Sequence, residues 1–153
     1  MFIRQLLFIT LMLSILTIGP IHGEYEFKAS EHQDQADITT SELKDIVKNI
    51  QSKADVNSYL GTNYQEVRGE MYNNTVWRFD ISPKPNYQFM AELDRIDIEG
   101  LQKGLVNYIV FISFGEEEST IISKSIYYCD HSENVREVKY IGNQEKENVI
   151  FSR

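Results

Sequence analysis

The clearest strand pattern in this chain is the run Thr75-Val76-Trp77-Arg78-Phe79-Asp80-Ile81. Its odd-numbered side chains, which include the only tryptophan, fall on one face, and the even-numbered ones fall on the other. Alternation with a period of two is typical of a strand that is buried on one side. We therefore expect this strand to anchor the hydrophobic core through Trp77.

An amphipathic helix is expected before this strand. The run Thr39-Thr40-Ser41-Glu42 fits a capping box, in which the threonine hydroxyl and the glutamate satisfy backbone amides at the helix start. An apolar stripe at helical spacing follows, made of Leu43, Ile46, Val47 and Ile50. Two interpretations fit the next stretch: a short second helical turn at 52–60, or a loop that enters a strand at about 59–64.

The second half of the chain favours further strands. Apart from the proline-containing turn at 82–86 and an irregular charged connection at 94–104, the expected strands are 87–93, 106–114, 120–129 and 135–141. The segment 106–114 is nearly all apolar, which indicates a central strand covered on both faces. An acidic hairpin loop is expected at 115–119, and the strand 135–141 at an edge. The fold class is therefore α+β, with one amphipathic helix packed on an antiparallel sheet of about four or five strands.

The chain begins with a pattern typical of a secretory signal peptide. A weakly positive start at Arg4 precedes a short apolar run at 6–18, which Gly19 and Pro20 end, and Gly23 offers a small residue for cleavage. An uncleaved membrane anchor is the alternative, but a span takes roughly 20 apolar residues. We expect residues 1–23 to be a signal peptide, 24–38 a flexible N-terminal segment, 39–142 the domain and 143–153 a loose C-terminal tail.

A secreted, extracellular chain that starts at or near Glu24 and no longer contacts the membrane is the expected product. The reason is the brevity of the apolar run and its Gly-Pro end. N-terminal sequencing of the secreted protein measures this start. An intact Met1 on membrane-bound material would contradict the expectation.

Composition argues against several kinds of function. The formal net charge of -8 disfavours nucleic acid as a partner. Cys129 is the only cysteine, so it has no internal disulfide partner, and its neighbour His131 lacks an identifiable orienting carboxylate. Asp94, Asp97 and Glu99 do not have the oxygen spacing of a calcium loop. We expect no enzyme activity, no cofactor, no metal and a monomer.

A short motif suggests a more specific function. The run Gln65-Glu66-Val67-Arg68-Gly69 fits Q-x-V-x-G, and Tyr72 follows. Together with the preceding helix, it resembles the first inhibitory hairpin loop of the cystatin superfamily, whose members block papain-like cysteine proteases. The resemblance implies a helix gripped by an antiparallel sheet, with a wedge that enters the protease cleft. It also implies that Gln65, Glu66, Val67, Arg68 and Gly69 form the protease-binding loop and that Gly69 supplies its backbone freedom.

The chain departs from that family at several places. Charged Glu66 and Arg68 stand where small or apolar residues are usual, and neither the Pro-Trp pair of the second wedge loop nor the two disulfides of secreted relatives are present. The function expected from the resemblance is a secreted inhibitor of papain-like cysteine proteases. The alternative is a secreted, non-inhibitory interaction or structural protein with a cystatin-like helix-on-sheet fold.

A different hairpin also fits the same residues. A three-residue loop at 73–75 would place Met71 opposite Trp77 and Gly69 opposite Phe79. Gly69 would then lie in the middle of a strand and not at a loop tip. Separately, Asn73-Asn74-Thr75 is an N-glycosylation acceptor pattern, which makes Asn73 a candidate for glycosylation in a eukaryotic source.

Overall fold

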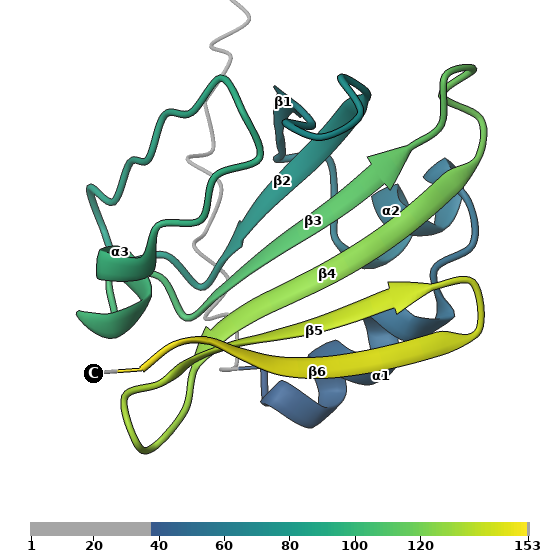
Figure 1. Ribbon diagram of the computed structural model, residues 1–153. Coiled ribbons are helices and arrows are strands. Elements are labelled where there is room, and N and C mark those ends of the chain that lie inside the picture. The colour runs from purple at the N-terminus through teal and green to yellow at the C-terminus, as the bar shows by residue number, and fades with distance from the viewer. Residues whose placement is uncertain (1–37, 153) are drawn as a thin grey trace, which may run out of the picture. The chain divides into compact units, whose positions relative to one another are not determined.

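The computed structural model describes residues 38–152, so the predicted signal peptide and nearly all of the predicted flexible segment lie outside the described residues. Three helices and six strands form an α+β structure (Figure 1). Their order is α1 (Thr40–Asn49), α2 (Lys53–Tyr59), β1 (Gln65–Arg68), β2 (Thr75–Ile81), α3 (Ile98–Gln102), β3 (Tyr108–Phe114), β4 (Ile121–Cys129), β5 (Val135–Ile141) and β6 (Gln144–Phe151).

All six strands belong to one antiparallel sheet in the order β1-β2-β3-β4-β5-β6, so each strand pairs with its neighbours in sequence. Each strand reverses the direction of the one before it. The hairpin loops 69–74, 115–120 and 142–143 therefore lie at the same end of the sheet. This arrangement lets segments that are far apart in sequence share one end of the molecule.

The prediction of one helix on a sheet of about four or five strands was wrong, because the sheet has six strands and the described residues contain three helices. Two strands were not expected: β1, where the resemblance placed a loop, and β6, which lies where a loose tail at 143–153 was expected. A two-residue turn, Gly142-Asn143, leads into it, with Gly142 at a φ of +56°. Such a turn is a hairpin signal. The sequence pattern did not predict this strand, because β6 is rich in charged residues and its mostly exposed side chains form no apolar face.

The segment 87–93 was expected to be a strand, but only an isolated parallel bridge between Arg68 and Leu93 forms there. It belongs to the long connection between β2 and β3, which also contains α3 in a region expected to be irregular. The apolar side chains that suggested a strand pack instead against residues of the sheet. For example, the Phe89 ring lies 4.5 Å from the guanidinium carbon of Arg78.

The helices α1 and α2 each begin at a capping box in the local sequence. The predicted capping box is confirmed, because the Thr39 hydroxyl accepts from the Glu42 amide and the Glu42 carboxylate accepts from the Thr39 amide. Of the two interpretations of 52–60, the structure has the helix, α2, which starts with a second capping box made by Ser52 and Asp55. These caps satisfy backbone amides that the first helical turn leaves unpaired.

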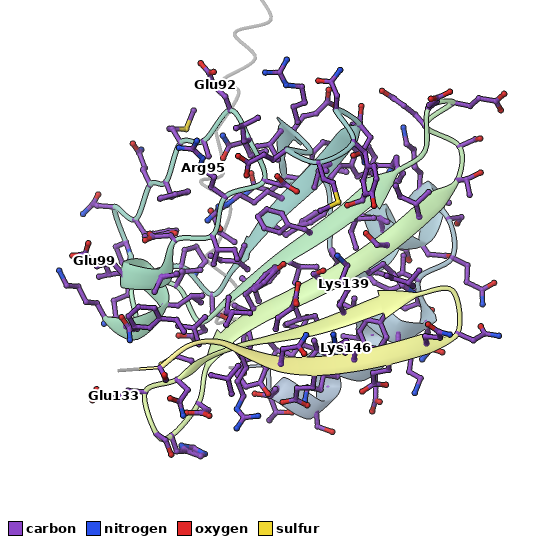
Figure 2. The ribbon with its side chains drawn as sticks, viewed as in Figure 1. Glu92, Arg95, Glu99, Glu133, Lys139 and Lys146 are labelled. Atoms are coloured by element: carbon purple, nitrogen blue, oxygen red, sulfur yellow. The ribbon has the colours of Figure 1, made fainter. Side chains whose placement is uncertain are left out.

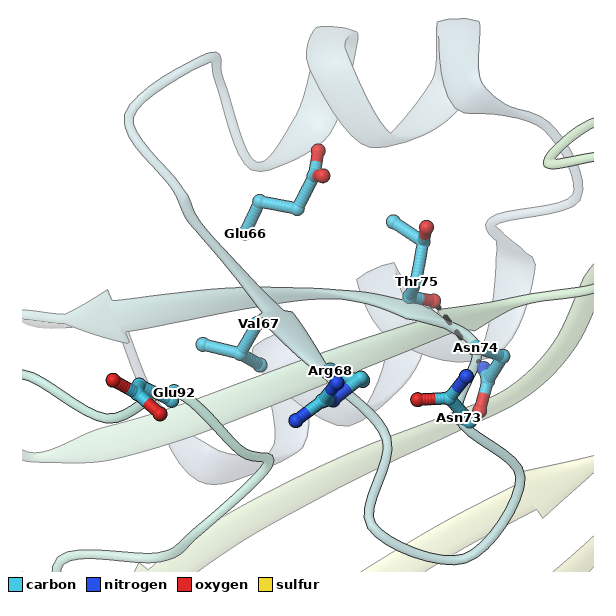
Figure 3. A pocket seen from close by; sticks show the side chains of 7 residues that line it. All are labelled: Glu66, Val67, Arg68, Asn73, Asn74, Thr75 and Glu92. Atoms are coloured by element: carbon cyan, nitrogen blue, oxygen red, sulfur yellow. Dashed lines mark hydrogen bonds between the residues drawn. The ribbon is translucent and has the colours of Figure 1, made fainter.

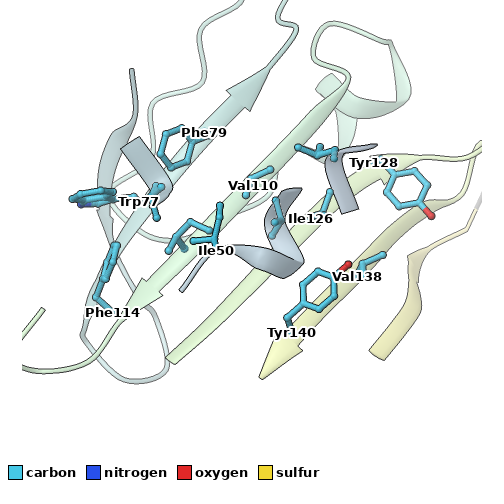
Figure 4. Packing of buried hydrophobic residues seen from close by; sticks show 13 residues of the cluster. Ile50, Trp77, Phe79, Val110, Phe114, Ile126, Tyr128, Val138 and Tyr140 are labelled. Carbon is cyan, nitrogen blue, oxygen red and sulfur yellow. The ribbon is translucent and has the colours of Figure 1, made fainter. Parts of the chain in front are cut away.

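The main core lies between α1, α2 and one face of the sheet (Figure 4). Trp77 is 6% exposed in this core, which confirms its predicted role as an anchor. Its ring stacks on Tyr64 with centroids 4.0 Å apart and meets Phe114 edge-on at 4.8 Å. Aromatic contacts of this kind stabilise a core beyond the apolar area that they bury.

A second core covers the opposite face of the sheet. The connection 82–107 lies over that face and contributes Leu101 and Val106, which pack with Ile109 and Phe111 of β3. The strand β3 is thus buried on both sides, as its nearly continuous apolar sequence predicted.

The β4–β5 loop is organised around one carboxylate. Asp130 accepts from the backbone amides of Ser132 and Asn134 at 2.8 and 3.0 Å, and from Nε of Arg136 at 2.6 Å. These donors stabilise the charged form, with Arg136 as the largest cause, and lower the pKa of Asp130 to about 2.

We expect part of the acid sensitivity of this protein to come from Asp130. Its folded pKa lies below its ordinary value, so its contribution to stability is complete above about pH 4 and is lost as the pH falls towards about 2. Replacing Asp130 by Asn should therefore lower the melting temperature at pH 7, and the difference from the unaltered protein should shrink towards pH 2. Thermal unfolding across this pH range measures the effect, and a difference that does not depend on pH would contradict it.

Candidate functional site

The tip of the β1–β2 hairpin exposes two large, neighbouring side chains. A six-residue loop, 69–74, joins the two strands, and its base is closed by hydrogen bonds from the Gly69 amide to the Asn74 carbonyl (2.8 Å) and from the Asn73 amide to the Gly69 carbonyl (2.9 Å). At the tip, Met71 is 80% exposed and Tyr72 is 74% exposed. Contiguous exposed apolar surface can mark a site for a protein partner.

The structure places only one of the five predicted binding residues, Gly69, in that loop. Gln65, Glu66, Val67 and Arg68 form β1, and Gly69 is the first residue of the loop. In the β1–β2 register, Gln65 lies opposite Arg78 and Val67 lies opposite Val76. Gly69 is thus neither at the tip, as the protease-loop interpretation required, nor in the middle of a strand, as the other hairpin required.

The motif residues divide into internal and exposed ones. Val67 is 5% exposed within the second core, and the side-chain amide of Gln65 donates to the Ala91 carbonyl at 2.9 Å. Glu66 and Arg68 are exposed. Two of the five predicted binding residues are therefore occupied inside the molecule. The binding role assigned to Gln65, Glu66, Val67, Arg68 and Gly69 stays a prediction.

The hairpin is held on one side by the segment 91–95. The Arg68 amide donates to the Glu92 carbonyl and the Asp94 amide donates to the Arg68 carbonyl, both at 3.0 Å. The Asp94 carboxylate accepts from the Glu70 amide at 2.9 Å. The free edge of β1 is therefore covered by this segment, in which Glu92 and Arg95 are labelled in Figure 2.

A buried arginine holds the segment in place. Arg78 is 1% exposed. It donates through Nη1 to the Arg95 carbonyl at 2.7 Å and pairs through Nη2 with Asp80 at 2.8 Å. The Tyr87 hydroxyl lies 3.4 Å from Nη2 and donates to Asp97, and burial raises the pKa of this tyrosine, which keeps it protonated. The network links β2 to both ends of the segment 87–97.

On its other side, the hairpin is fastened to the β3–β4 loop. The side-chain amide of Asn74 donates to the Phe114 carbonyl at 2.9 Å, and the Thr75 hydroxyl donates to Glu118 at 2.7 Å. The second oxygen of Glu118 pairs with Lys53 of α2 at 3.2 Å. Contacts on both sides thus fix the base of the hairpin, while Met71 and Tyr72 project from it.

A pocket of about 470 Å³ lies beside the hairpin (Figure 3). It is lined by Glu66, Val67, Arg68, Asn73, Asn74, Thr75 and Glu92. Within residues 38–152, no group of three or more His, Cys, Asp or Glu is placed to hold a metal ion, and none of the helices is long and apolar enough to cross a membrane.

Gly69 is the position at which the hairpin base is most sensitive to substitution. A Cβ atom there would lie 2.3 Å from Oδ1 of Asn74. We expect Gly69→Ala to displace the side-chain amide of Asn74 from the Phe114 carbonyl and to lower the free energy of unfolding by about 1–2 kcal/mol. Urea unfolding measures this loss. In an Asn74→Ala background the same glycine substitution should cost much less, and equal costs in both backgrounds would contradict the explanation.

Sequence reasoning did not identify Met71 and Tyr72 as the exposed tip. The resemblance placed the loop at 65–69 and the other hairpin placed it at 73–75, whereas the loop spans 69–74, between β1 and β2. The sequence signal for this loop was Asn73-Asn74, since Asn73 takes a φ of +53°, which asparagine tolerates better than a β-branched residue such as Thr75 does.

No protein-family model, curated protein or solved structure matches this chain.

Proposed function

We propose that this chain is a secreted protein that binds another protein through the tip of the β1–β2 hairpin, with papain-like cysteine proteases as the target class. The observation that carries the proposal is the exposure of Met71 and Tyr72 on a loop whose base is fixed on both sides. A projecting apolar pair on a braced loop is a suitable wedge for a cleft.

The physical advantage of such a loop is its preorganisation. A loop that is already ordered loses little conformational entropy on binding, so more of the contact energy appears as affinity. Tyrosine is among the residues that dominate interface energies, and methionine adapts to irregular apolar surfaces. The two side chains would therefore supply most of the binding energy, and the rest of the hairpin would supply their position.

The protease class follows from the resemblance in Gln65, Val67 and Gly69, with changed roles for these residues. Gln65 and Val67 anchor β1 from inside, and Gly69 allows the hairpin to close against Asn74. Glu66 and Arg68 stay at the solvated rim, where their charges need not be desolvated. Inhibition by this wedge should be reversible, because only non-covalent contacts hold it.

The test is inhibition of papain, measured with a fluorogenic substrate, by the secreted protein and by the double variant Met71→Ala/Tyr72→Ala. We expect the double variant to inhibit at least about tenfold more weakly, since truncating interface anchors costs more than about 1 kcal/mol each, and to keep its melting temperature. Met90→Ala is the matched control, because Met90 is 84% exposed on a different loop. This control should inhibit as the unaltered protein does.

A second candidate function is favoured by the internal use of the motif. Because Gln65 and Val67 have structural partners, the motif has a role without any protease. The protein would then be a secreted, non-inhibitory interaction protein that uses the same hairpin. Failure to inhibit papain-like proteases well into the micromolar range, about -8 kcal/mol of binding, would sink the inhibitor proposal and leave this candidate.

A further inference from the structure

The two edges of the sheet differ in how they are covered. At β1 the segment 91–95 bonds to the backbone of Arg68. At the opposite edge, β6 is eight residues long, and no strand among residues 38–152 lies along its outer side. An uncovered antiparallel edge presents unpaired amides and carbonyls that can bond to another strand.

The usual protection of such an edge by charge is weak in β6. Glu145 and Glu147 are already paired with Lys48 and Lys44 of α1, at 3.2 and 3.1 Å. Among the described residues, Lys146 is the one charged side chain of β6 without an ion pair (Figure 2). The second half of the strand, 148–151, carries no charge, and its Val149 is 49% exposed.

We propose that β6 pairs antiparallel with β6 of a second copy of this chain, with Asn148 facing Asn148 of the other copy. Symmetry restricts the register of such a pair. A two-fold axis perpendicular to the sheet joins equivalent faces of the two copies. Side chains alternate between the faces, so one residue of β6 must face its own counterpart.

Charge selects that residue. A register centred on Glu145, Lys146 or Glu147 would set like charges directly opposite each other, which is destabilising. A register centred beyond Asn148 shortens the overlap, and Ile150 is the extra residue of a bulge, where the pairing of β6 with β5 shifts. Centring on Asn148 pairs an uncharged amide with itself and sets Glu147 opposite Val149.

The expected contact is small, so the dimer should be weak. It refines the monomer expected from the sequence, because the monomer remains the form at low concentration. The edge at β6 is the far edge of the sheet from β1 and its hairpin (Figure 1), and the proposal is independent of the proposed function. Loss of dimerisation and loss of hairpin binding can therefore be measured separately.

The first measurement is sedimentation of the secreted chain from about 5 to about 500 µM, a range that brackets weak association. We expect monomer at the low end and a growing share of dimer at the high end. Val149→Glu should reduce dimerisation at every concentration, because it places a second carboxylate opposite Glu147. Its melting temperature should not change at low concentration, since Val149 is 49% exposed.

The second measurement tests the register by disulfide formation in a Cys129→Ser background, which removes the native thiol. Asn148→Cys should form a disulfide-linked dimer on mild oxidation, because self-facing residues come within disulfide reach. Lys146→Cys and Val149→Cys are the matched controls, and neither should cross-link, because each faces a different residue of the other copy. Monomer at all concentrations, or equal cross-linking at all three positions, would overturn the proposal.

Discussion

Replacing Arg78 by Met is expected to lower the free energy of unfolding by about 3 kcal/mol, since removing one member of a buried ion pair leaves its partners without compensation. Arg78 is 1% exposed and bonds to Asp80 and to the Arg95 carbonyl. Methionine fills similar space between Phe89 and Phe111, so the loss of charge and hydrogen bonds dominates the effect. Urea unfolding monitored by Trp77 fluorescence measures the change.

The matched control for this variant is Arg95→Met. Arg95 is exposed, and its contribution to the network is its backbone carbonyl, which the substitution keeps. We expect a change within about 0.5 kcal/mol, as for other surface substitutions. Equal losses for the two variants would show that the buried guanidinium has no special role.

The same substitution should loosen the hairpin from a distance. Arg78 holds the Arg95 carbonyl, and the neighbouring residues bond to β1 through the amides of Arg68 and Asp94. Hydrogen exchange at these two amides should accelerate in Arg78→Met, while amides in β5 keep their protection. If the hairpin binds a protease, the variant should inhibit more weakly even though Met71 and Tyr72 are unchanged, because preorganisation is lost.

The sequence predicted the elements whose pattern is complete within a few neighbouring residues. The odd-numbered side chains of β2 meet the helices as their alternation predicted, although the other face of the strand, expected to be open, is also buried at Val76 and Arg78. The helix α1 begins after Thr39 because its capping box is complete within four residues. The apolar run of β3 is continuous because both of its faces are buried. In each case, the sequence over a few residues contains the whole physical reason for the element.

The elements that were missed depend on partners distant in sequence. β6 has no apolar face, and its glutamates pair with lysines of α1 that are about a hundred residues earlier. The segment 87–93 alternates like a strand but stays irregular, because Phe89 covers Arg78. The motif Gln65-Glu66-Val67-Arg68-Gly69 reads as a loop in isolation, yet its pairing with β2 and with the segment 91–95 makes it a strand.

Lys124 shows the same dependence, and Lys124→Met should lower the free energy of unfolding by about 2 kcal/mol, because buried acceptors left unpaired cost about 1–3 kcal/mol. This lysine of β4 points into the main core and is 8% exposed. Its Nζ donates to the carbonyls of Lys48 and Ile50, both at 2.8 Å. These carbonyls end α1, where a cation also interacts favourably with the helix dipole.

Methionine retains the aliphatic length of Lys124 but cannot donate, so the variant isolates the cost of the unpaired carbonyls. Lys48→Met is the matched control: this lysine lies at the same helix end, and its exposed ion pair with Glu145 should contribute less than about 1 kcal/mol. Thermal and urea unfolding compare the two. A Lys124→Met variant as stable as Lys48→Met would show that water satisfies the end of α1. A larger loss would establish that β4 caps this helix through a side chain 76 residues from its first acceptor.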